Sequence, residues 1–238
     1  MTHSSEMTQA AVRIEEFPES ELGAALAARV AEDLVNAIRD RGHASLAVPG
    51  GTTPVAFLRA LGRIDLPWDR VTATLTDERW VPTDNARSNQ RTLAETLFQG
   101  RAAAARFVPL YSCANEPALG LPAVAAALEE ALPLDVCVLG MGNDMHTASL
   151  FPDSPDLARA LAPEDGAPVL AVTAPGAPEP RITLTGPVLA GAARLYLLIR
   201  GTAKRAALAQ AIATGDPQRA PIRAILDAAA APLVFYAD

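Results

Sequence analysis

Short apolar or β-branched runs alternate along this chain with alanine-rich segments of helical periodicity. We expect strands at residues 44–48, 71–75, 135–139, 169–172 and 195–199, and a shorter one at 182–184. We expect helices at residues 21–39, 88–98, 118–131, 203–213 and 221–228. This alternation predicts an α/β fold with a mostly parallel sheet and helices on both faces. Ligands of such sheets bind at the carboxyl ends of the strands, so a site is expected in the loops there.

The length and apolar content fit one large domain. The chain has 238 residues, and half of them are hydrophobic, which is enough for a sizeable core. Residues 162–181 are rich in Pro, Gly and Ala, and we interpret them as loops around one short strand rather than a linker between domains. We therefore expect a single domain over residues 1–238, in which residues 1–10 form a flexible tail.

Charge and local composition argue against several classes of partner. The formal net charge is −7 and no Lys/Arg cluster stands out, so we expect no nucleic acid partner. No run of about 20 apolar residues is present, which argues against a membrane span. The polar start, residues 1–9, does not resemble a secretory signal, so we expect a cytoplasmic protein. Two cysteines, Cys113 and Cys137, do not indicate a disulfide framework.

The first candidate loop is PGGTTP, residues 49–54, between a strand and a helix. Gly50 and Gly51 allow a tight turn that brings backbone N–H groups close to a ligand, and Thr52 adds a hydroxyl. Pro54 suits the first turn of a helix, whose N-terminus carries a partial positive charge. The loop is built as a phosphate cradle, although a tight turn without a ligand accounts for the same residues.

The second and third candidate loops carry charged side chains. Residues 76–82 hold Asp77 and Arg79, and the Arg guanidinium is suited to phosphate; the simpler alternative is a surface ion pair with a solvated Glu78. Residues 140–152, GMGNDMHTASLFP, hold Asp144 and His146 two positions apart. A histidine titrates near neutral pH, and a carboxylate beside it orients the ring, so this pair is a candidate for acid–base chemistry.

Two further basic residues are candidates for an anion site. Arg181 opens RITLTGP, and Lys204 lies in GTAKR at an expected helix start. Taken alone, each is an ordinary exposed base. Three histidines in the whole chain argue against a His-rich metal centre.

Five segments in order resemble the 6-phosphogluconolactonase family: PGGTTP, TDERWVPTDNARSN, LGMGNDMHTASLFP, RITLTGPVL and IRGTAKR. The resemblance covers almost the whole chain. It implies a Rossmann-like core shared with glucosamine-6-phosphate deaminases. It also implies hydrolysis of 6-phosphoglucono-1,5-lactone, the second step of the oxidative pentose phosphate pathway, without metal or organic cofactor.

The resemblance also implies roles for individual residues. His146 matches the family's general base. Arg79, Arg181 and Lys204 match basic residues around the phosphorylated substrate, and Gly50, Gly51 and Thr52 match the phosphate-side loop. Asp77 and Asp144 match acidic positions. The implied partner is a phosphorylated sugar lactone, bound by a monomer or a small homo-oligomer.

Two residues depart from the family pattern. Met145 stands where the family has Gly between the Asp and the His, and a positive φ there would strain a Met side chain. Pro49 stands where the family has Ser, which removes a hydroxyl and a backbone N–H. Phosphate contact then depends on the residues that follow Pro49.

Two other functions compete with that of a lactonase. The deaminase of the same fold has a Glu soon after its His, where this chain has Phe151. A sugar-phosphate-sensing regulator would need a DNA-binding helix-turn-helix, and no spare segment for one is present. A purely structural role leaves three polar loops at strand ends without a purpose.

Overall fold

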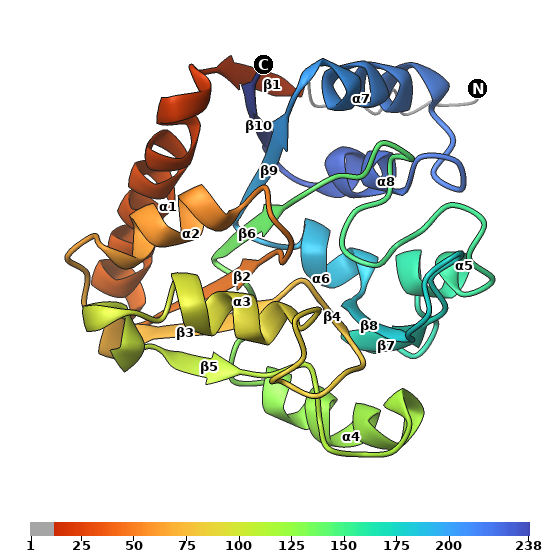
Figure 1. Cartoon of the computed structure of the whole chain (residues 1–238), viewed down its shortest axis with the longest axis horizontal. Helices are drawn as coiled ribbons and strands as arrows, with labels where there is room; N and C mark the ends of the chain where they lie inside the picture. The colour runs from red at the N-terminus through yellow and green to blue at the C-terminus, as the bar shows by residue number, and fades with distance from the viewer. Residues whose placement is uncertain (1–11) are drawn as a thin grey trace, which may run out of the picture.

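A seven-stranded parallel sheet runs through the centre of the computed structural model, which describes residues 12–238 (Figure 1). The flexible tail expected at residues 1–10 lies outside this range. The strand order is β1-β10-β9-β6-β2-β3-β5, and every pair is parallel. The strands are β1 (Arg13–Glu16), β2 (Ala44–Val48), β3 (Val71–Leu75), β5 (Arg106–Val108), β6 (Val136–Leu139), β9 (Arg194–Arg200) and β10 (Leu233–Ala237).

Helices cover both faces of this sheet, as the alternating pattern predicts. Figure 1 shows α1 and α2 on one side, at the left of the view, and α6, α7 and α8 on the other. The helices are α1 (Glu19–Arg41), α2 (Val55–Gly62), α3 (Asn89–Thr96), α4 (Pro117–Leu128), α5 (Leu157–Leu161), α6 (Gly186–Ala190), α7 (Thr202–Thr214) and α8 (Pro221–Ala228). No helix within residues 12–238 is long and apolar enough to cross a membrane.

The spacing of apolar residues explains the longest helix. Leu22, Leu26, Val30 and Leu34 recur at intervals of four, so they form one stripe along α1, and all four are buried. The helix ends at Gly42, whose φ of +81° is a left-handed conformation that glycine adopts without strain. The buried stripe fixes α1 against the sheet and against α2.

A second, antiparallel sheet of three strands was not predicted. It has the order β4-β8-β7, with β4 (Asp77–Arg79), β7 (Val169–Val172) and β8 (Arg181–Leu184). The prediction of a loop at Asp77 and Arg79 was therefore wrong at this point, because these residues pair with β8. Buried Thr76 joins the two sheets: its N–H donates to Val48 O at 3.0 Å, and its carbonyl accepts from Leu184 N at 2.9 Å.

Candidate active site

A cavity of about 260 Å³ opens at the carboxyl ends of β2, β6 and β9, the edge where the fold predicts a ligand. Its wall combines the loop after β2, the start of the loop after β6, and single side chains from other elements. The lining residues are 49–54, Asp77, Arg79, Asn89, 140–142, His146, Ala148, Leu198 and Lys204.

The 49–54 loop presents free backbone donors to this cavity. The N–H groups of Gly50, Gly51, Thr52 and Thr53 make no hydrogen bond to any residue in the part of the chain that the structure describes. Gly51 has φ +88°, a conformation that L side chains rarely adopt. The loop leads into α2, so these N–H groups and the helix N-terminus act together on an anion. Pro49 removes one donor, and four remain.

His146 and Asp144 form a hydrogen-bonded pair at the cavity. His146 Nδ1 lies 2.5 Å from Asp144 Oδ1, and the His146 N–H also donates to Oδ1 at 3.3 Å. Burial would raise the pKa of Asp144, but the hydrogen bond and charge of His146 lower it overall below its ordinary value. An ionised carboxylate on Nδ1 holds the proton there, which leaves Nε2 as the basic nitrogen.

The backbone of the 140–152 loop holds this pair in place. Gly142 N donates to His146 O at 2.9 Å, and Met145 N donates to Gly142 O at 3.1 Å. Met145 has φ +67°, so the position keeps the left-handed conformation that the family's glycine suggested. The Met145 carbonyl accepts from Ile222 N at 3.2 Å, which ties the strained residue to α8.

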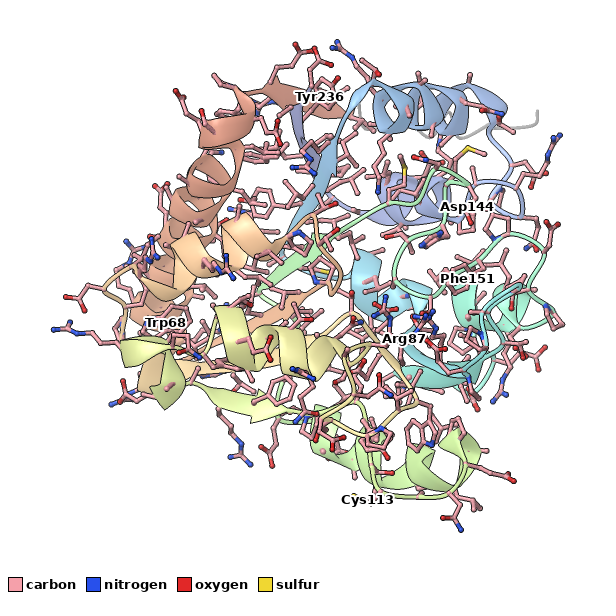
Figure 2. The ribbon with its side chains drawn as sticks, in the orientation of Figure 1. Trp68, Arg87, Cys113, Asp144, Phe151 and Tyr236 are labelled. Carbon is pink, nitrogen blue, oxygen red and sulfur yellow. The ribbon has the colours of Figure 1, made fainter. Side chains whose placement is uncertain are left out.

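Phe151 packs on the histidine. The two ring centroids are 4.6 Å apart with the planes tilted by 41°. Figure 2 shows Asp144 and Phe151 on the same side of the molecule, along the loop that follows β6. The place of the deaminase's Glu is thus taken by an aromatic ring in contact with His146.

Two arginines lie directly opposite one another on β4 and β8. Arg79 pairs in register with Arg181, and the Nε atoms of both are buried without a partner in the described residues. Burial, with the charge of Arg79, lowers the pKa of Arg181 below its ordinary value. Like charges directly opposite each other repel unless an anion lies between them. Arg79 lines the cavity, whereas Arg181 lies beside it and is not part of the wall.

Glu179 supplies part of the missing negative charge. Its Oε1 accepts from Arg87 Nε at 2.7 Å and lies 3.7 Å from Arg181 Nη2. Arg79 Nη1 donates to the Arg87 carbonyl at 2.6 Å. The charge of Asp77 also acts on Arg181, so two carboxylates lie among three guanidinium groups. This corner of the molecule therefore stays positive, in a chain whose net charge is negative.

Lys204 reaches the cavity from the first turn of α7. Its Nζ donates to the Met141 carbonyl, which fixes the ammonium beside the 140–152 loop. Burial lowers the pKa of Lys204, and the nearby charge of Asp144 partly opposes this. A half-buried ammonium with one carbonyl partner retains donors for a ligand.

Asp77 faces the cavity and is held by residues that the sequence did not single out. Its Oδ2 accepts from buried Ser149 Oγ at 2.6 Å, and Ser149 N donates to Thr183 Oγ1 at 3.3 Å. Ser149 lies three residues after His146, so the 140–152 loop positions both the histidine and Asp77. This position within HTASLFP was the one sequence signal that could have indicated the link.

Glu78 is buried and caps α3, so its interpretation as a solvated neighbour was wrong. Its carboxylate accepts from the backbone N–H groups of Arg79, Asn89 and Gln90 at 2.7–2.8 Å, and from Ser88 Oγ at 3.1 Å. Burial raises the pKa of Glu78, although these hydrogen bonds act against the shift. Ser88 is the N-cap residue of α3, and its side chain accepts from Arg91 N.

The structure thus brings most of the predicted site residues to one cavity. Those on its wall are Gly50, Gly51, Thr52, Asp77, Arg79, His146 and Lys204. Asp144 joins the site through His146, and Arg181 through Arg79. Among residues 12–238, no group of three or more His, Cys, Asp or Glu side chains is arranged to hold a metal ion.

Comparison with known proteins identifies relatives over nearly the full length. A 6-phosphogluconolactonase of Rhizobium meliloti is 51% identical over 219 residues, which cover 91% of this chain and 94% of the relative. The enzyme of that name from Pseudomonas aeruginosa is 45% identical, with 89% and 88% covered. A crystal structure of a 6-phosphogluconolactonase from Shewanella baltica superposes with a TM-score of 0.92 at 37% identity, covering 96% and 98%.

A more distant structure shares the fold alone. A monomeric glucosamine-6-phosphate deaminase superposes with a TM-score of 0.75 at 17% identity and covers 95% of this chain and 97% of its own. The family model described as glucosamine-6-phosphate isomerases/6-phosphogluconolactonase matches residues 18–234. The chain therefore belongs to the family of glucosamine-6-phosphate isomerases and 6-phosphogluconolactonases.

Proposed function

We propose that this protein is a lactone hydrolase that converts 6-phosphoglucono-1,5-lactone to 6-phosphogluconate, the second step of the oxidative pentose phosphate pathway. The observation that carries the proposal is the Asp144–His146 pair in a cavity shared with the free N–H groups of residues 50–53. Relatives that are 45–51% identical and named 6-phosphogluconolactonase support it.

The basic groups of the cavity bind the phosphate in this proposal. The N–H groups of Gly50, Gly51 and Thr52, with Lys204 and Arg79, surround the phosphate oxygens with donors, and Arg181 adds positive charge from behind Arg79. Binding energy from this remote group fixes the lactone ring in the cavity. A lactone without the phosphate loses that positioning.

His146 acts as general base. Its Nε2 takes a proton from water while the water oxygen attacks the lactone carbonyl carbon, with Asp144 holding the ring and stabilising the imidazolium. The tetrahedral intermediate then collapses, the bond from C1 to the ring oxygen breaks, and the imidazolium returns the proton to that oxygen. Asp77 and Asp144 are the acidic residues of the site. No metal or organic cofactor takes part.

The deaminase alternative is disfavoured at Phe151. In that motif a Glu follows the His and completes a relay with the Asp and the His, whereas here an apolar ring packs with its centroid 4.6 Å from that of the His146 ring. We also propose that residues 1–238 act as one domain in the cytoplasm, as a monomer or small homo-oligomer.

The test is the hydrolysis of freshly prepared 6-phosphoglucono-1,5-lactone, followed by proton release and corrected for spontaneous hydrolysis. We expect saturable turnover, and a kcat/KM at least about 100-fold lower for glucono-1,5-lactone, which lacks the phosphate. Ammonia release from glucosamine 6-phosphate is measured in parallel. Ammonia release without lactone turnover would overturn the proposal.

A further inference from the structure

Asn89 is a buried polar residue on the cavity wall that the proposed reaction does not use. It is the first residue of α3, and its backbone N–H is bound by Glu78 Oε1 at 2.8 Å. Asn89 is 1% exposed and lines the cavity. Asn89 is therefore held in place, because the buried Glu78 carboxylate binds its backbone N–H and its side chain forms part of the cavity wall.

The hydrogen bonds determine which amide atom faces which way. Asn89 Nδ2 donates to the Asp77 carbonyl at 2.8 Å, and a carbonyl can only accept, so the NH₂ group must lie on that side. Oδ1 then points away from Asp77. It has no hydrogen-bond partner in the part of the chain that the structure describes. A buried acceptor without a partner is costly, which indicates that something outside the chain supplies a donor.

Gly50 leaves room for this oxygen. A Cβ built on Gly50 would lie 1.9 Å from Asn89 Oδ1, so any other residue at position 50 would occupy its place. The amide oxygen thus lies over the 49–54 loop. Residue 50 serves two functions, because it contributes a free N–H and also permits Asn89 to approach.

The polar groups of the cavity divide by chemistry. The N–H groups of residues 50–53, Arg79 and Lys204 are donors, which suit phosphate oxygens. Asn89 Oδ1 is an acceptor, and so is the carboxylate of Asp77. A phosphate dianion has no proton to give to these acceptors, whereas a sugar hydroxyl has one.

From this division we propose that Asn89 Oδ1 accepts a hydrogen bond from a ring hydroxyl of the bound phosphosugar lactone and makes Asn89 a specificity-determining residue. The inference rests on the proposed lactone substrate. A site built to bind a hydroxyl discriminates strongly against an analogue that lacks it, because the buried acceptor is then left unpaired.

The test compares 6-phosphoglucono-1,5-lactone with its 2-deoxy, 3-deoxy and 4-deoxy analogues. For the wild type we expect kcat/KM to fall by about 10-fold to 100-fold with one of the three. Two variants are assayed on the same panel: Asn89→Ala, and Asn89→Ser, which offers a smaller donor toward the Asp77 carbonyl. In both variants, kcat/KM for that deoxy lactone should lie within about 2-fold of kcat/KM for the parent lactone.

Gln90→Ala is the matched control. Gln90 is the next residue of α3 and also has a buried unpaired oxygen, Oε1, but it does not line the cavity. Because its side chain does not face the substrate, Gln90→Ala should change kcat/KM for all four lactones by the same factor. The variant should therefore keep the wild-type discrimination among them.

The outcomes separate the two proposals. If the wild type hydrolyses the parent lactone but shows no discrimination in the panel, or if the Asn89 variants keep it, the role of Asn89 is overturned and the lactonase stands. If the wild type does not hydrolyse the parent lactone, both proposals fail.

Discussion

Replacing Gly142 with alanine would place a methyl group against the Asp144–His146 pair. A Cβ built on Gly142 lies 2.3 Å from Asp144 Oδ1 and 2.3 Å from both Nδ1 and Cε1 of His146, whereas ordinary contact begins near 3.4 Å. The backbone or the two side chains must therefore move by about 1 Å. Asn143 is the next residue in the same loop and is exposed, so replacing it with alanine creates no such clash.

A displacement of about 1 Å at reacting groups costs on the order of 10²-fold in rate. We therefore expect kcat of Gly142→Ala for fresh 6-phosphoglucono-1,5-lactone to fall about 100-fold, which corresponds to about 3 kcal/mol of transition-state stabilisation. The overpacked loop should also lower the free energy of unfolding by about 1–3 kcal/mol. Both are measured on the same preparation, by initial rates and by urea denaturation.

Asn143→Ala is the control for this change. It alters the same loop without touching the pair, so its kcat should stay within about 2-fold of wild type. A folded Gly142→Ala variant with a wild-type kcat would refute the reasoning, because the close approach of the Gly142 backbone to His146 would then have no bearing on catalysis.

Three further predictions follow from single residues. Met145→Gly should be about 1 kcal/mol more stable to urea than Met145→Ala, because φ +67° strains any L side chain; equal stability would contradict that strain. Glu78→Gln should lose about 1–3 kcal/mol of unfolding free energy in urea, since the amide cannot accept from every donor at the start of α3; an unchanged midpoint would rule this out. Burial lowers the pKa of Lys204, so the ammonium loses its proton as pH rises through that lowered value. As pH rises, the wild type should therefore lose affinity for 6-phosphogluconate before pH reaches 10.5, the ordinary pKa of lysine, whereas Lys204→Arg should not. Affinity is measured by calorimetry at a series of pH values, and the same pH dependence in both proteins would contradict the prediction.

The elements that the sequence predicted well are those with local signals. The apolar stripe of α1 predicted a helix, and the apolar run of β2 predicted a strand. Helix α8 was predicted with its observed bounds, Pro221–Ala228. In the central sheet, strands β1, β5 and β10 were missed. Of these, β10 is a fully buried apolar run that periodicity could have indicated.

Strands β7 and β8 of the small sheet were expected at residues 169–172 and 182–184, but β4 and the antiparallel pairing could not be predicted from local pattern. The strands of this sheet have three or four residues, and β4 pairs with β8 about 100 residues later, so only the tertiary fold brings them together. This pairing places Arg79 beside Arg181 and explains why Arg181 reaches the site indirectly. The burial of Glu78 is likewise invisible in sequence, because its partners lie at the start of α3.

The site was predicted from loops at strand ends, and most of its residues do meet at one cavity. The roles of Asn89 and Ser149 were not predicted, although both fall within motifs that carried the family resemblance. A motif identifies which residues recur together, whereas hydrogen-bond geometry tells which of them face the cavity and which support a neighbour.

The central claim is that His146 is the base of a phosphosugar lactonase. Its most direct test is the initial rate of 6-phosphoglucono-1,5-lactone hydrolysis by His146→Gln, with spontaneous hydrolysis subtracted and folding confirmed by the unfolding midpoint. General-base catalysis contributes about 10²-fold to 10⁴-fold, so we predict that kcat falls by at least 10². A folded His146→Gln protein with kcat within a few-fold of wild type would contradict the account.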